Sequence, residues 1–128
     1  MVVLVYWANT HGQETSVYQT DVASKSDSVT IAKGDTTEYE LIVFDPAFGN
    51  WFATHRKPVW YHDKEFYHVK NTLYTSYWNN LVIDKRHRPP YDFEIEYDPA
   101  VDYGIRVNWQ LYWYYKYLEE KYKIKLGP

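Results

Sequence analysis

Apolar and polar side chains alternate along several stretches of the chain, and this period of two restricts the fold more than any other feature. Successive residues of a β-strand point to opposite faces, so alternation predicts strands. Residues 29–33 alternate in this way, and a second run follows at 38–44, after Gly34-Asp35. Because Gly and Asp favour tight turns, the two runs predict a β-hairpin. The unbroken apolar stretch 41–44 predicts a strand covered on both faces, which Asp45-Pro46 ends.

Three further stretches show strand patterns. Residues 75–78 and 81–83 flank Asn79-Asn80, and Asn tolerates positive φ, so these residues predict a second tight hairpin. Residues 92–98 alternate acidic with apolar side chains, which predicts a strand with one acidic face. Residues 105–115 alternate as well, with apolar side chains at the odd-numbered positions.

The C-terminal stretch carries a competing signal. Helical spacing relates a set of apolar and aromatic residues there, namely Leu111, Tyr114, Tyr115, Leu118 and Tyr122. The helix-forming run 119–121 lies among them. We interpret the stretch as a strand to about Tyr115 followed by a short helix, and the choice between strand and helix over 107–123 stays open.

Many short strands separated by Gly, Pro and Asn turns are typical of β-sandwiches and small barrels. We therefore expect an all-β fold, either an immunoglobulin-like or jelly-roll-like sandwich or a small barrel, with a short C-terminal helix. The length of 128 residues predicts one domain over 1–128.

The aromatic content is high: 15 Tyr, 6 Trp and 5 Phe make up 20% of the chain. Large rigid aromatic side chains are enriched at protein interfaces. In a strand over 107–115, Trp109 and Trp113 would face the core, whereas Tyr112, Tyr114 and Tyr117 would form an outward row. These three tyrosines are the candidate interface, with burial under another segment of the chain as the alternative. The preferred partner is a protein, either a second copy or an assembly partner.

The net charge of −3 is unevenly distributed. Residues 55–90 carry seven Lys or Arg against three acids, giving +4, while the segments on either side are acidic. Basic residues beside aromatic ones hold single-stranded nucleic acid, by charge and by stacking. The candidate residues for this second function are Arg56, Lys57, Lys85, Arg86 and Arg88. The alternative is a solvated basic loop.

Side chains that could bind a metal or perform acid–base chemistry are present but poorly spaced. His62 and His68 would lie roughly 20 Å apart on a strand, or about 120° apart around a helix. Neither arrangement brings both to one metal ion. The carboxylates at 92, 94, 96 and 98 have a glycosidase-like separation, but such a row more often forms the solvated face of an outer strand.

No catalytic or nucleotide-binding motif occurs. With no Cys and only five Gly, the chain has no thiolate chemistry, no Gly-rich phosphate loop and no nucleophile elbow. We expect a protein that is not an enzyme and has no cofactor and no metal site.

The apolar run 1–7 lacks a basic region before it and is too short to cross a bilayer, so it predicts a strand. We therefore expect no signal peptide, no transmembrane segment and no membrane partner, in an intracellular soluble or virion-associated protein.

The leading hypothesis is a non-enzymatic structural or protein-interaction domain that self-associates through aromatic surface. Its composition is typical of viral accessory or coat-associated proteins, and zero Cys with one Met suits a thermophilic source. A third hypothesis is a glycan-binding module that stacks sugars on Trp51, Trp60 and Trp78.

Overall fold

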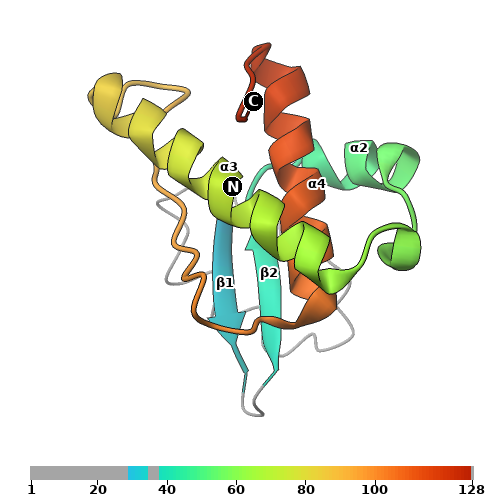
Figure 1. Cartoon of the computed structure of the whole chain (residues 1–128). Helices are drawn as coiled ribbons and strands as arrows, with labels where there is room; N and C mark the ends of the chain where they lie inside the picture. The colour runs from blue at the N-terminus through green and yellow to red at the C-terminus, as the bar shows by residue number, and fades with distance from the viewer. Residues whose placement is uncertain (1–28, 35–37, 128) are drawn as a thin grey trace.

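The computed structural model describes residues 29–34 and 38–127, so the strand predicted over 1–7 lies outside the described residues. In chain order the elements are β1 (Val29–Lys33), β2 (Tyr39–Val43), α2 (Phe48–His55), the short 3-10 helix η2 (Val59–Tyr61), α3 (Lys64–Asp84) and α4 (Gly104–Tyr122) (Figure 1). The expected all-β sandwich or barrel is wrong, because the described chain is 53% helical and its sheet has two strands.

The predicted first hairpin is confirmed. β1 and β2 pair antiparallel, with Val29 opposite Val43 and Ile31 opposite Leu41. The N–H of Gly34 donates to the carbonyl of Glu38 at 3.1 Å and closes the turn. Residues 41–44 are all buried, as the unbroken apolar stretch predicted.

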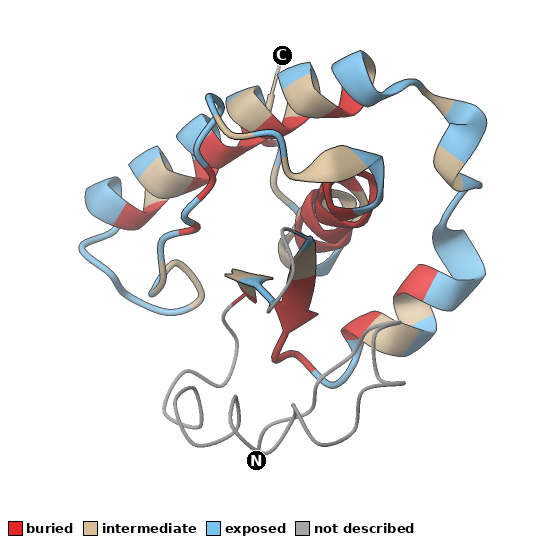
Figure 2. Ribbon diagram, turned by 90° about the horizontal axis from the view of Figure 1, so that it is seen from below, coloured by how far each residue is buried: buried red, intermediate tan, exposed pale blue. Residues whose placement is uncertain are grey.

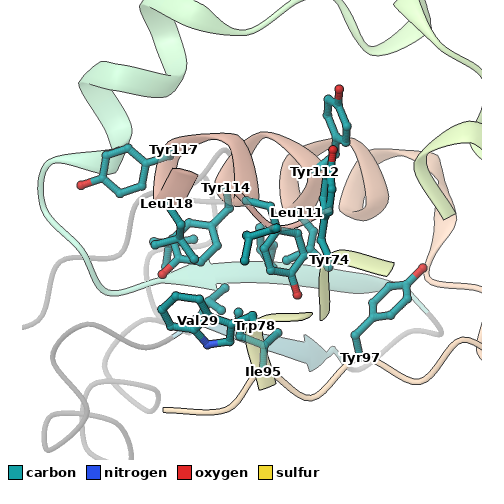
Figure 3. Packing of buried hydrophobic residues seen from close by; sticks show 14 of the residues in the cluster. Val29, Tyr74, Trp78, Ile95, Tyr97, Leu111, Tyr112, Tyr114, Tyr117 and Leu118 are labelled. Atoms are coloured by element: carbon teal, nitrogen blue, oxygen red, sulfur yellow. The ribbon is translucent and has the colours of Figure 1, made fainter. Parts of the chain in front are cut away.

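Helix α4 lies at the centre of the core. It packs against α3, α2, β2 and η2, and Figure 2, which views it nearly end-on, shows these elements around it. The helix starts at Gly104, whose φ of 90° is a conformation that favours glycine. Buried side chains on α4 include Leu111 and Leu118, and Figure 3 shows both within the aromatic cluster.

The strand predicted over 105–115 is wrong, and the burial of α4 explains why. Ten of its residues between 107 and 118 are buried, including the polar Asn108 and Gln110. A helix that is covered on nearly every side needs no polar stripe, so its sequence lacks a clear period of 3.6. Asn108 and Gln110 resemble residues on the outer face of a strand, although both lie inside the core.

The hairpin predicted around Asn79-Asn80 is also wrong, because residues 75–83 lie within α3. Thr, Tyr, Trp, Val and Ile favour strands by intrinsic propensity, but packing decides their conformation here. Trp78 and Val82 are fully buried four residues apart, on the side of α3 that faces α4.

The strand predicted over 92–98 is wrong, because the segment 91–98 forms no strand and joins no sheet in the described part of the chain. Its alternation is real, since Ile95 and Tyr97 are buried while Glu94 and Glu96 are exposed. Side chains of α3 form the hydrogen bonds to its backbone that a neighbouring strand would otherwise form. The indole N–H of Trp78, for example, donates to the carbonyl of Phe93 at 2.8 Å.

Candidate protein-binding face of helix α3

Helix α3 is the longest described element. Its N-cap is Asp63, whose carboxylate accepts a hydrogen bond from the N–H of Phe66 at 2.8 Å. At 1.5 Å per residue its 21 residues span about 31 Å. One side of the helix is buried against α4, through Tyr67, Asn71, Tyr74, Thr75, Trp78 and Val82.

The opposite side of α3 exposes large apolar side chains. Val69, Leu73 and Tyr77 are 47%, 37% and 43% exposed and follow one another at intervals of four residues, which places them in one row. Ile83 continues the surface at 58% exposure. Ser76 and Asn80 lie between them and are also exposed. We call Val69, Leu73, Ser76, Tyr77, Asn80 and Ile83 the α3 face; it carries no charge, and Figure 2 shows this side of the helix open along its length.

The tyrosines expected to form an outward row do not do so. Tyr112, Tyr114 and Tyr117 are all buried within this chain. The physical reason is that they lie on α4, where a helix in the middle of the core directs side chains inward on almost every side. Burial raises the pKa of the phenol of each of the three.

One of these tyrosines belongs to a buried charged network. The carboxylate of Asp45, at the end of β2, accepts hydrogen bonds from the Tyr117 hydroxyl at 2.7 Å and from the Lys121 ammonium at 2.8 Å. It also accepts from the N–H of Ala47 at 3.0 Å. These contacts connect the hairpin to the C-terminal half of α4.

The residues proposed for nucleic-acid binding fall into two separate groups. Arg56 and Lys57 precede η2, near the N-terminal end of α3, whereas Lys85, Arg86 and Arg88 follow its C-terminal end. The length of α3, about 31 Å, separates the two groups (Figure 1). The basic segment 55–90 therefore does not form one continuous groove.

The three Trp residues proposed for glycan stacking do not share a surface. Trp78 is fully buried, and Trp51 stacks on His55 with 4.3 Å between ring centroids while also lying beside Trp113. Trp60, at 75% exposure, is the member that remains open to a ligand.

A buried polar cluster that we did not predict joins α3, α4 and the segment 91–98. The Asn71 amide donates to Asn108 Oδ1 at 3.1 Å, and the Tyr97 hydroxyl donates to the same oxygen at 2.6 Å. Tyr97 also bonds to Nδ1 of His68 at 3.1 Å. Burial, together with nearby Tyr103 and Asp102, raises the pKa of Tyr97 to about 12, so its hydroxyl stays protonated at neutral pH.

That protonation state determines the role of His68. Because the Tyr97 hydroxyl donates to Asn108, its oxygen remains available to accept a hydrogen bond from an N–H at Nδ1 of His68. A hollow of about 180 Å³ lies beside this ring, lined also by Lys64 and the loop 99–102. Lys64 is already paired with Asp102 at 3.0 Å, so the hollow gains no net charge from them.

No group of three or more metal-ligating side chains lies together in the described ranges 29–34 and 38–127. His62 stacks on Phe66 with 3.7 Å between ring centroids, while His68 bonds to Tyr97. The acidic side chains of 92–98 are exposed, and Glu94 lies 3.6 Å from His87.

A surface depression follows the C-terminal end of α3. It measures about 380 Å³ and is lined by Asp84, Lys85, Arg86, Arg88, Pro89 and Tyr91. We call it the basic hollow.

Within the described part of the chain, no helix combines the length and apolar character needed to cross a bilayer. Comparison with curated proteins and with solved structures finds no match for the chain. A family model, by contrast, matches residues 3–128, which is almost the whole sequence. The chain therefore belongs to the family of unknown function DUF6146.

Proposed function

We propose that this chain is a non-enzymatic protein-interaction module that pairs with a second copy of itself through the α3 face. The supporting observation is the row Val69, Leu73 and Tyr77 on the side of α3 that lies opposite the core. Single exposed apolar residues are ordinary on protein surfaces, but a contiguous row on one helix is typical of a contact surface.

The absence of charge on the α3 face favours a partner that is uncharged in the same place. Between Glu65 and Asp84, the exposed residues of this face are apolar or neutral polar, and the half-buried Lys70 at its border directs its ammonium over the Phe66 ring. A second copy offers such a surface, and a two-fold axis uses the same patch on both partners. The row with a spacing of four residues suits the packing of helix ridges into grooves.

Charge and side-chain size favour an antiparallel pair centred on Leu73. In that arrangement Val69 of one copy meets Tyr77 of the other, so a small side chain packs against a large one. A parallel pair would place Tyr77 against Tyr77 and the carboxylate of Glu65 against its own equivalent. Opposed like charges and two large rings at one position are both unfavourable.

Leu73→Glu tests the proposal, with Ile105→Glu as the matched control. The two side chains have nearly equal exposure, 37% and 38%, but Ile105 lies in the first turn of α4, outside the α3 face. Leu73 lies at the centre of a two-fold contact, so one substitution removes an apolar side chain from both copies at once. The dimer should therefore dissociate about 100-fold more readily, or more. Light scattering after size exclusion, over a wide range of protein concentration, measures the mass.

We expect a dimer for the parent chain and for Ile105→Glu, and a monomer for Leu73→Glu with an unchanged far-ultraviolet circular dichroism spectrum. The dimer should persist in high salt because the contact is apolar. A monomeric parent chain at every concentration, or a dimer that survives Leu73→Glu, would contradict the proposal.

A further inference from the structure

The turn after α3 holds two consecutive residues in a conformation that normally belongs to glycine. Arg86 has φ of 56° and His87 has φ of 59°, both in the left-handed region. A residue with a Cβ atom adopts this region at a cost that glycine does not have. Unfavourable backbone conformations of this kind are concentrated at functional sites, where a particular side chain is needed.

The basic side chains of the turn are not needed to complete the helix. The backbone N–H groups of Lys85, Arg86 and His87 already donate to three of the last carbonyls of α3, at 2.8, 3.0 and 2.9 Å. These carbonyls belong to Leu81, Ile83 and Val82, respectively. Since the backbone satisfies the C-terminal carbonyls, the charges of Lys85, Arg86 and Arg88 remain available for another contact.

Those charges also have no counter-ion within the part of the chain that the structure describes. The ion pairs there join Lys64–Asp102, His87–Glu94, Lys116–Glu119 and Lys121–Asp45. None of them includes Lys85, Arg86 or Arg88. All three of these residues line the basic hollow, in which Asp84 is the one acidic residue.

We propose that the basic hollow binds a phosphate group. Arginine matches the geometry of phosphate oxygens with two parallel hydrogen bonds, and Lys85 adds a third donor group. The volume of about 380 Å³ lies at the lower end of the range for small-molecule sites. It admits a phosphate together with the group that carries it.

The apolar wall of the hollow indicates what can accompany the phosphate. Tyr91 and Pro89 line it beside the cations, and Trp78 supports the Tyr91 ring with 5.5 Å between centroids. The N–H of Tyr91 donates to the carbonyl of Arg88 at 2.7 Å, which fixes the backbone of Tyr91 relative to the turn. A flat group attached to the phosphate, such as a nucleobase, has a surface to contact there.

Three probes separate the sources of the phosphate: inorganic phosphate, a nucleoside monophosphate and a short single-stranded oligonucleotide. Each is titrated by calorimetry into the full-length chain at low salt. Inorganic phosphate binding as tightly as the nucleotide identifies the phosphate alone as the ligand. Tighter binding of the nucleotide indicates contact with Tyr91. Tighter binding of the oligonucleotide, with a steep loss in salt, indicates a nucleic-acid strand.

Arg86→Gly is the decisive variant, and Lys123→Gly is its matched control. Lys123 ends α4 with φ of 57°, so both substitutions remove one cation and one left-handed residue with a Cβ atom from the end of a long helix. Both should leave the melting temperature unchanged or raise it. Arg86→Gly should weaken binding of the tightest probe by about tenfold or more, because it removes charge-assisted hydrogen bonds.

Saturable binding that is lost in Arg86→Gly and kept in Lys123→Gly supports the proposal. Three results would overturn it: no binding of any probe to the parent chain, equal binding by Arg86→Gly, or an equal loss in Lys123→Gly. Arg86 and Arg88 are not part of the α3 face, so Arg86→Gly removes no side chain from the proposed dimer contact.

Discussion

The side-chain amide of Asn79 pairs with both backbone polar groups of Ile95. Its Nδ2 donates to the carbonyl of Ile95 at 2.9 Å, and its Oδ1 accepts from the N–H of Ile95 at 2.8 Å. A residue in an antiparallel strand exchanges the same two bonds with its neighbour. One side chain of α3 therefore makes the two hydrogen bonds to Ile95 that a neighbouring strand would make.

Asn79→Ala should destabilise the protein markedly. The substitution leaves the N–H and the carbonyl of buried Ile95 without these partners, which costs about 2–4 kcal/mol. Urea unfolding measures the loss. Asn50→Ala, at an exposed position of α2, is the control and should change stability by less than about 0.5 kcal/mol. Equal stability of the two variants would show that the amide does not hold the segment.

Asp45 should make stability depend on acid pH. Burial raises the pKa of its carboxyl, but hydrogen bonds from Lys121, Tyr117 and the N–H of Ala47 outweigh burial, and the net pKa lies below the usual 3.8. A carboxyl with a lowered pKa stabilises the folded state above its unfolded pKa. That contribution is lost as the pH falls through 3.8 toward the folded value.

Asp45→Asn should therefore lower the free energy of unfolding by about 2 kcal/mol at pH 7. The difference in unfolding free energy between the variant and the parent chain should shrink as the pH falls to about 3. Denaturant unfolding at the two pH values measures this change. Asp92→Asn, which alters an exposed carboxyl, is the matched control. If the difference in unfolding free energy between Asp45→Asn and the parent chain stayed constant with pH, Asp45 would not be the source of the acid dependence.

Alkaline pH should unfold the protein steeply. Burial raises the pKa of Tyr97 to about 12, so the folded state keeps a proton that the unfolded chain releases near pH 10. A group with a raised pKa stabilises the fold below its unfolded pKa, and this contribution is lost between pH 10 and about 12. Tyr97→Phe should reduce the slope of unfolding free energy against pH by about 1.4 kcal/mol per unit there. Tyr61→Phe, at an exposed position, is the matched control.

The orientation of the proposed dimer can be tested by mixing two variants. Val69→Glu and Tyr77→Lys should each weaken the homodimer. In an antiparallel pair of one chain of each kind, Glu at 69 meets Lys at 77 while the other Tyr77–Val69 contact is retained. The mixture should therefore associate more tightly than either variant alone. No gain on mixing would contradict the antiparallel arrangement.

The sequence predicts those parts of the fold that depend on local pairing. The signals for the hairpin of β1 and β2, including the buried run 41–44, lie within sixteen consecutive residues, 29–44, and the pairing of the two strands confirms the hairpin. The alternation of 92–98 gave the right buried and exposed residues, but it could not reveal that the partner was the side chain of Asn79.

The helices could not be predicted, because their burial hides the usual pattern. α4 is covered on almost every side, whereas α3 has apolar residues on both its inner and its outer side, so neither shows one clear apolar stripe. Val69, Leu73 and Tyr77 do have helical spacing, but it is visible only once the buried set has been recognised. The bond between Asn71 and Asn108 joins residues 37 positions apart and leaves no local signal.

The position of α4 in the chain has a consequence for biosynthesis. β2, α2, η2 and α3 all pack against this helix, yet it is the last described element to leave the ribosome. At roughly 5–20 residues per second, α4 takes about 1–4 s to make, and until then the aromatic faces that it will cover have nothing to pack against. A nascent chain that stalls before Gly104 therefore presents these faces to chaperones and proteases. The faces become covered only after α4 has been synthesised.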